Sequence, residues 1–110
     1  MEKILEQTLL YDFYGELLTE HQKEIYEDVV LNDYSFSEIA QERGISRQGV
    51  HDLIKRCNKI LQDYEEKLHL VEKFLSIKEQ IQEIEGSLHS SERMDKGQLL
   101  QKLQGILEQL

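Results

Sequence analysis

The sequence predicts an all-α protein, and three observations support that fold class. The 110 residues include no proline and only six glycines, and they are rich in Leu, Ile, Glu, Gln and Lys, which lose little side-chain freedom in a helix. Apolar residues recur every three or four positions along most of the chain, which is the spacing of one helical face. Residues that cap helices stand directly before several of these runs. A chain of this length supports one modest core, so anything larger requires oligomerisation.

The first third of the chain predicts two helices. Apolar and aromatic residues between positions 4 and 14 follow helical spacing, and Gly15 is expected to end a helix of about 13 residues. Thr19 and Gln22 have the spacing of a capping box, in which each side chain accepts a hydrogen bond from the other residue's backbone. A second helix follows. Residues 32–33 (Asn-Asp) predict the turn after it, because both side chains bond readily to nearby backbone.

Residues 34–56 predict a helix-turn-helix. Ser35 and Glu38 have the spacing of a second capping box. Gly44 is expected to end a helix of roughly two turns in the left-handed conformation that glycine adopts readily. Ser46 then caps the next helix at once. The two helices are therefore joined by a very short turn, as a helix-turn-helix requires.

After this turn the pattern predicts one long helix. Apolar residues alternate at spacings of four and three for more than three heptads. They are Val50, Ile54, Cys57, Leu61, Tyr64, Leu68, Val71 and Leu75. The register then shifts, which predicts a bend or a change of packing partner near residue 75. A loop at residues 86–93 and a last amphipathic helix are predicted to follow. The predicted domains are residues 1–61, with the N-terminal helices and the helix-turn-helix, and residues 62–110, a helical stem and C-terminal helix for dimerisation.

The charge is distributed unevenly. The formal net charge is -9, which is unusual for a nucleic-acid-binding protein, because affinity for a duplex rests largely on neutralising phosphates. Residues 1–34 carry a net charge of -7, residues 35–61 carry +2 and residues 62–110 carry -4. The helix-turn-helix therefore coincides with the net-positive segment.

The helix after Ser46 has a polar side opposite its apolar side. The candidate nucleic-acid-binding residues there are Ser46, Arg47, Gln48, His51, Asp52, Lys55, Arg56 and Lys59. Arg47, Gln48, His51 and Asp52 are the candidate base readers, and Lys55, Arg56 and Lys59 are the candidate phosphate anchors. Gly49 has no side chain on this face. Its absence would permit close approach either of a phosphate or of the preceding helix. The alternative interpretation is an ordinary solvated helix face, which is also commonly charged.

The motifs carry a family resemblance. Residues 18–61 contain Leu-Thr-Glu-His-Gln-Lys-Glu, Phe-Ser-Glu-Ile-Ala and Ile-Ser-Arg-Gln-Gly-Val, and this stretch resembles region 4 of sigma-70-type transcription factors, which reads promoter DNA in the major groove. The whole length, with Ile-Lys-Arg after the last motif, resembles the YlxM family of small helix-turn-helix proteins. That resemblance implies a regulatory role and a link to the signal recognition particle pathway. Asp52 departs from the sigma pattern by placing a negative charge on the reading face.

Catalysis, metal binding and membrane insertion have no support in the sequence. No nucleophile elbow, phosphate loop or glycine-rich fingerprint occurs, and the four histidines lie too far apart for a local ligand set. We therefore predict no enzyme, cofactor or metal. The single cysteine fits a reducing compartment, and the N-terminus lacks an apolar run for a secretory signal or membrane span. We expect a cytoplasmic protein without a membrane partner.

Two questions have alternative answers at this point. The apolar stem predicts a homodimer, and the alternative is a monomer in which the C-terminal helix folds back on the stem of its own chain. The predicted function is a DNA-binding regulator of the helix-turn-helix class. The alternative is an adaptor that binds protein or RNA components of the secretory targeting machinery, among them the signal recognition particle, without binding DNA.

Overall fold

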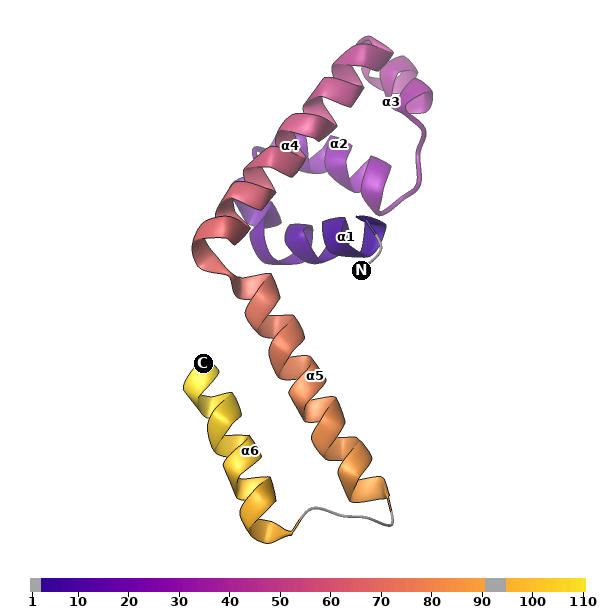
Figure 1. The fold of residues 1–110 in the computed structure, drawn as a ribbon. Coiled ribbons are helices and arrows are strands. Elements are labelled where there is room, and N and C mark those ends of the chain that lie inside the picture. Colours follow the sequence, from indigo (N-terminus) through magenta and orange to yellow (C-terminus); the bar gives the residue numbers. More distant parts are fainter. Residues whose placement is uncertain (1–2, 91–94) are drawn as a thin grey trace. The chain divides into compact units, whose positions relative to one another are not determined.

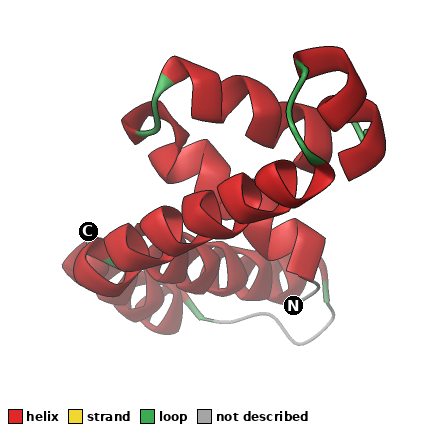
Figure 2. Cartoon of the chain, turned by 90° about the horizontal axis from the view of Figure 1, so that it is seen from above, coloured by secondary structure: helices red, strands yellow, loops and turns green. Residues whose placement is uncertain are grey.

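The computed structural model describes residues 3–90 and 95–110, which form helices joined by short turns (Figures 1 and 2). The elements are α1 (Lys3–Tyr14), the 3-10 turn η1 (Gly15–Leu17), α2 (Glu20–Val30), α3 (Phe36–Arg43), α4 (Arg47–Leu68), α5 (Leu70–His89) and α6 (Lys96–Gln109). No strand occurs within the described ranges, so the all-α prediction is confirmed. The chain divides into two compact units, Met1–His69 and Leu70–Leu110. This division lies after residue 69, eight residues beyond the domain boundary predicted after residue 61.

Helices α2, α3 and α4 begin directly after the predicted capping residues Thr19, Ser35 and Ser46. Thr19 Oγ1 accepts a hydrogen bond from Gln22 N at 3.2 Å, and Gln22 Oε1 accepts one from Thr19 N at 3.0 Å. Ser35 and Glu38 form the same reciprocal box before α3. Gly44 has a φ of 68°, and its N–H donates to a carbonyl within α3, so it ends that helix in the left-handed conformation. The predicted pair of short-linked helices is present.

The first unit packs α4 against α1, α2 and α3. Its buried apolar side chains are Leu10, Tyr14, Leu18, Ile25, Tyr26, Ile39, Ala40, Val50, Ile54, Cys57 and Leu61. The last four belong to α4 and follow the predicted spacing of four and three. That spacing places them on one side of the helix, so the opposite side stays available to solvent.

Polar side chains also join α1 and α2 to α4. The Tyr26 hydroxyl donates to Asn58 Oδ1 at 2.6 Å, and Gln7 Nε2 donates to the same oxygen at 3.2 Å. The Tyr14 hydroxyl donates to Glu65 Oε1 at 2.6 Å. Because hydrogen bonds depend strongly on direction, these contacts fix the rotation of α4 about its own axis and thereby the side that it exposes.

The prediction that one helix continues to a bend near residue 75 is wrong. α4 ends at Leu68, and His69 has a φ of 56°, in the left-handed region. The His69 N–H donates to Glu65 O at 2.8 Å. The left-handed conformation costs a non-glycine residue roughly 1–2 kcal/mol. The spacing of apolar residues does not predict such a conformation. The helix break therefore lies at residue 69, inside the heptad pattern.

The second unit is an antiparallel hairpin of α5 and α6. Gln80 and Gln109 exchange side-chain hydrogen bonds of 3.0 and 2.9 Å, and Lys102 Nζ lies 2.7 Å from Glu83 Oε1. The C-terminal helix therefore folds back on the preceding helix of its own chain. The loop prediction for residues 86–93 is wrong for Gly86–His89, which are helical, and positions 91–93 lie outside the described residues.

Candidate nucleic-acid interface

The N-terminal end of α4 is fixed by Ser46. Its Oγ accepts a hydrogen bond from Gly49 N at 2.9 Å, which satisfies one of the unpaired donors of the first turn. Glycine at the third helical position has no side chain to return the bond, so this cap is a single hydrogen bond. α4 therefore begins at Arg47, three residues after Gly44, and this start sets which residues occupy its first turn.

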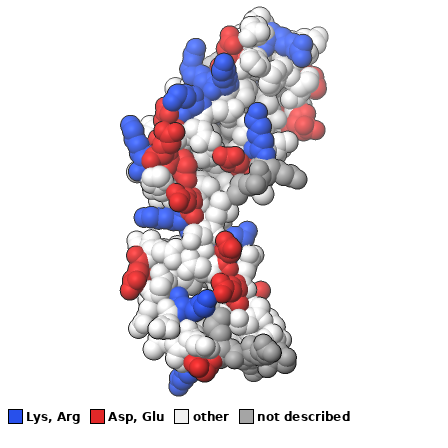
Figure 3. Space-filling view, in the orientation of Figure 1, with Lys and Arg blue, Asp and Glu red and all other residues white. Residues whose placement is uncertain are grey.

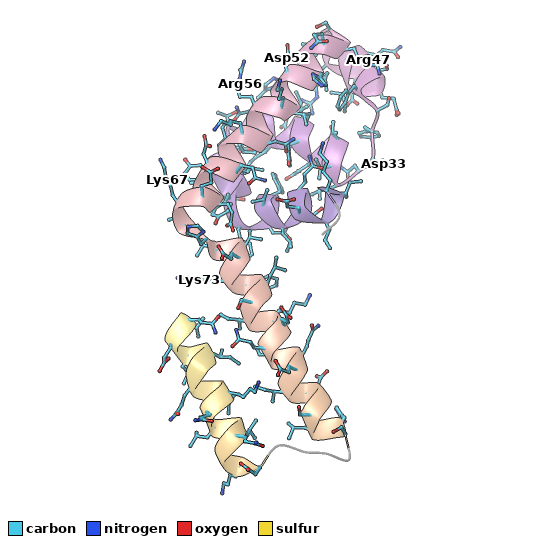
Figure 4. All side chains as sticks on the ribbon, viewed as in Figure 1. Asp33, Arg47, Asp52, Arg56, Lys67 and Lys73 are labelled. Carbon is cyan, nitrogen blue, oxygen red and sulfur yellow. The ribbon has the colours of Figure 1, made fainter. Side chains whose placement is uncertain are left out.

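All eight candidate residues are exposed, and α4 supplies seven of them. At 100° per residue, four of them follow the side opposite the buried one. These four are Gln48, Asp52, Lys55 and Lys59. His51 and Arg56 flank this row, and Arg47 lies at the N-terminal end of the helix (Figure 4). We call Ser46 together with these seven residues the α4 outer face.

Two of the five basic side chains between residues 35 and 61 are engaged inside the first unit. Arg43 Nη1 lies 2.8 Å from Glu24 Oε2 and therefore ties α3 to α2. Lys59 Nζ lies 2.6 Å from Asp63 Oδ1, one helical turn further along α4. The hydrogen bond to Asp63 raises the pKa of Lys59, so Lys59 remains charged, but a neighbouring carboxylate offsets its charge.

The other three basic side chains are not engaged in this way. Arg47, Lys55 and Arg56 are exposed, and none of their side chains makes an ion pair or hydrogen bond with another described residue. Figure 3 shows Lys and Arg atoms gathered beside the N-terminal half of α4, and Figure 4 shows Arg56 extending away from the helix. The α4 outer face therefore holds three cations that are available to an anionic ligand.

Three of the four side chains predicted as base readers, those of Gln48, His51 and Asp52, contact one another. Gln48 Nε2 donates to Asp52 Oδ1 at 2.9 Å. His51 Nδ1 lies 3.5 Å from Gln48 Nε2 and 3.6 Å from Asp52 Oδ1. A glutamine that reads adenine uses both its amide nitrogen and its amide oxygen. Gln48 would therefore have to release Asp52 before it could bind a base in that way.

Phe36 and Lys3 lie beside the candidate residues, although neither was among those predicted from the sequence. The Phe36 ring of α3 lies edge-on to His51, with ring centroids 5.8 Å apart, and both residues line a hollow of about 480 Å³ with Arg47. Lys3 of α1 and Lys55 of α4 line a neighbouring groove of about 420 Å³. These pairs join different helices, so no local spacing could have revealed them.

Gly49 is not required for packing against α3. A Cβ atom built at this position meets only Ser46 Oγ within 4 Å, at 3.1 Å. The interpretation of Gly49 as a packing residue for the preceding helix is therefore wrong. Close approach of a phosphate stays a prediction.

The described ranges hold no accessible thiol, metal-ligating cluster or membrane-spanning helix. Cys57 is fully buried among apolar side chains, and this burial raises the pKa of its thiol to about 11, so the thiol is neutral and shielded near pH 7. Residues 3–90 and 95–110 contain no cluster of three or more metal-ligating side chains. No helix among them combines the length and the apolar character needed to cross a bilayer.

Comparison with known proteins identifies the family. Residues 1–103 match the model of the UPF0122 family, described as "Putative helix-turn-helix protein, YlxM / p13 like". A UPF0122 protein of Caldanaerobacter subterraneus subsp. tengcongensis is 52% identical over 83 residues, which cover 76% of this chain and 71% of the relative. A UPF0122 protein of Acetivibrio thermocellus is 43% identical over 114 residues, covering 100% of this chain and 97% of the relative. A UPF0122 protein of Halalkalibacterium halodurans is 40% identical over 110 residues, which cover 100% of this chain and 95% of the relative. The chain therefore belongs to the UPF0122 family of YlxM/p13-like helix-turn-helix proteins.

Proposed function

We propose that this protein binds duplex DNA through the α4 outer face and acts as a regulator. The observation that carries the proposal is the availability of Arg47, Lys55 and Arg56 on the exposed side of the second helix of a helix-turn-helix. In such motifs the N-terminal turns of the second helix meet base edges in the major groove, and flanking groups hold phosphates. Membership of a helix-turn-helix family supports the same proposal.

The roles follow from the position and the partners of each side chain. Arg47, Gln48 and His51 lie in the first turns of α4, where they would reach base edges, and Phe36 would support the His51 ring from α3. Lys55 and Arg56 would bind phosphates. Asp52 and Asp63 lie on or beside the same face, and a carboxylate repels phosphate. We therefore expect weaker binding than a face with cations alone would give.

The acidic remainder of the chain makes the binding strongly salt-dependent. With a net charge of -9, the protein as a whole is repelled by DNA, and the attraction must come from a few close contacts. Each phosphate contact contributes about -0.9 to the slope of log K against log salt. Loss of Lys55 and Arg56, the two cations assigned to phosphates, should therefore reduce the slope by about 1.8.

Fluorescence anisotropy on labelled duplexes from the protein's own operon tests the proposal. The wild-type chain should bind, and the affinity should fall as salt rises. A variant with Arg47, Lys55 and Arg56 changed to alanine should lose binding. The matched control changes Lys67, Lys73 and Lys96 to alanine, because these lysines are exposed and lie off the α4 outer face. Both variants have the same net charge, so overall repulsion is equal in the two.

The outcomes distinguish binding at the α4 outer face from an effect of the protein's net charge alone. Retention of binding by the control and its loss in the α4 variant would support the proposal. Equal loss in both variants would show that only net charge matters. Binding that survives the α4 substitutions would place the contact elsewhere. We further propose that the protein acts in the cytoplasm as a homodimer, which would present two α4 helices to two half-sites.

A second candidate function is an adaptor in the signal recognition particle pathway. The observation that favours it is the net charge of -7 on residues 1–34, which would suit a basic partner rather than DNA. A pull-down with the protein and RNA components of the particle tests this candidate. A complex that survives alanine substitution of Arg47, Lys55 and Arg56 would show that the adaptor surface is not the α4 outer face. Absence of any complex would exclude this candidate.

A further inference from the structure

The hairpin of α5 and α6 has one apolar face, which the contacts between its two helices leave uncovered. α6 packs on the side of α5 that carries Ser76, Gln80 and Glu83, and these residues contact Gln109 and Lys102. The exposed apolar side chains of the hairpin lie elsewhere. Leu70 and Phe74 are each 40% exposed, and from position 81 onward the exposed side chains are Ile81 (52% exposed), Leu88 (44%), Leu100 (56%), Leu103 (45%), Leu107 (67%) and Leu110 (80%).

These side chains project to the same side of the hairpin. On α5, Ile81 and Leu88 lie roughly 115–135° around the helix from the centre of the side that carries Ser76, Gln80 and Glu83, at 100° per residue. On α6, Leu103 and Leu107 lie roughly 60–100° from Ile106 in the same rotational sense. Because the helices are antiparallel, the same rotation on each leads to one common side. Exposed polar residues occupy the other side, namely Glu79, Gln82, Gln98 and Gln101. We call the leucine- and isoleucine-lined side the hairpin apolar face.

The charges on the α5 part of this face complement those of a second α5 only when the two helices run antiparallel. Lys78, Ile81, Glu85 and Leu88 follow the spacing of a coiled-coil seam. Two parallel copies of α5 would place Lys78 opposite Lys78 and Glu85 opposite Glu85, which is repulsive. Two antiparallel copies that cross between positions 81 and 82 place each Lys78 opposite Glu85 of the second copy. Charge complementarity therefore favours a second copy of α5 in the antiparallel direction.

The α6 part of the face independently places the two-fold axis at the same height along the hairpin. Antiparallel copies of α6 that cross at position 105 place Leu103 opposite Leu107 and Leu100 opposite Leu110. Within one hairpin, the contacts of Ser76 and Gln80 with Gln109 and of Glu83 with Lys102 place position 81 level with roughly positions 104–108 of α6. A single two-fold axis therefore gives both the α5 pairing and the α6 pairing.

From this agreement we infer that the hairpin apolar face binds the same face of a second copy, giving an antiparallel four-helix bundle. The axis passes at the level of Ile81 and position 105, and a Lys78–Glu85 pair forms at each edge of the α5 seam. An isologous contact of this kind joins identical patches and closes at two subunits. The inference concerns assembly and does not depend on DNA binding, so the two can fail separately.

Light scattering on the full-length chain tests the assembly. The wild-type protein should have twice the mass of the 13.0 kDa chain. Changing Ile81 and Leu107 to aspartate should give a monomer, whereas changing Gln82 and Gln101 to aspartate, on the polar side, should leave the dimer intact. Circular dichroism checks that each variant keeps its helices. A monomeric wild type, or a dimer that survives the apolar substitutions, would overturn the inference.

A charge exchange tests the register without touching the apolar residues. Lys78→Glu alone should raise the dimer dissociation constant about tenfold or more, because two attractive pairs become repulsive. The double change Lys78→Glu with Glu85→Lys should restore it. Failure of the double change to restore the dimer would refute the antiparallel α5 register.

Cysteine cross-linking tests the direction of the helices. Ile81→Cys should form a disulfide-linked dimer, because the two copies of position 81 meet at the axis. Leu88→Cys should not, since seven residues at 1.5 Å each separate it from the axis by about 10 Å on either side. The native Cys57 is fully buried, so the wild-type chain serves as the uncross-linked control. Equal cross-linking at positions 81 and 88 would indicate parallel helices and contradict the inference.

Discussion

Removing the side-chain acceptor of Asn58 should lower the unfolding free energy of the first unit more than removing the hydroxyl of its partner Tyr26. The two substitutions break the same hydrogen bond. The Tyr26 side chain is fully buried, and its hydroxyl donates to Asn58 Oδ1 at 2.6 Å. Tyr26→Phe removes the donor and leaves the Asn58 oxygen with its second donor, Gln7 Nε2, at 3.2 Å. The expected cost is about 1 kcal/mol, the net value of one hydrogen bond.

Asn58→Ala has the opposite effect on the pair, because it leaves the Tyr26 hydroxyl buried without its acceptor. An orphaned buried donor costs about 1–3 kcal/mol in addition to the lost bond. The total for Asn58→Ala should therefore be about 2–4 kcal/mol. The double variant should cost less than the sum of the two single variants by about 2–4 kcal/mol, because that sum counts the shared bond twice and phenylalanine also removes the orphaned hydroxyl.

Urea unfolding of the four proteins, followed by circular dichroism, measures these differences through the midpoint and slope. Tyr26→Phe keeps the ring that stacks on Tyr11 at 5.4 Å, so packing changes little in the comparison. Equal costs for the two single variants, or strict additivity in the double variant, would refute the reasoning. Either result would mean that this bond does not hold α4 in its orientation.

Three other predictions follow from the same unit. Asp63→Asn should release Lys59 from its carboxylate partner and make the salt slope of DNA binding steeper by about 0.9, for one additional phosphate contact; an unchanged slope in anisotropy titrations would count against a phosphate role for Lys59. Ser46→Ala removes the single hydrogen bond to Gly49 N and should cost about 1 kcal/mol in urea unfolding, with weaker DNA binding because the first turn of α4 loosens; no loss of stability would disprove the cap. Because the pKa of buried Cys57 is raised to about 11, the unfolded thiol ionises first, and the unfolding free energy should fall between about pH 9 and pH 11 by more in the wild type than in Cys57→Ala; identical pH profiles would contradict this.

The parts of the fold that depend on neighbouring residues could be predicted from the sequence. The boxes at Thr19 and Ser35, the cap at Ser46 and the left-handed Gly44 each involve residues within a few positions, so the residue types alone define them. The buried side of α4 also follows from its apolar spacing. That spacing in turn indicates which residues form the α4 outer face.

The remaining features depend on contacts between distant residues or on an unusual backbone. His69 adopts the left-handed conformation without being glycine, and the apolar heptads continue across it. The Tyr26–Asn58 bond spans 32 positions, and the contact of Phe36 with His51 joins two helices. By contrast, the pairing of Lys59 with Asp63 has a local signal, because opposite charges four positions apart meet on a helix.

Backbone amide NMR of the full-length chain, titrated with duplex DNA, tests the central claim most directly. If the α4 outer face binds DNA, the amide signals that shift should cluster between residues 46 and 59, with smaller changes around Phe36 and Lys3. The shifts should weaken as salt rises. Shifts confined to α5 and α6, or no shifts at low salt, would contradict the account.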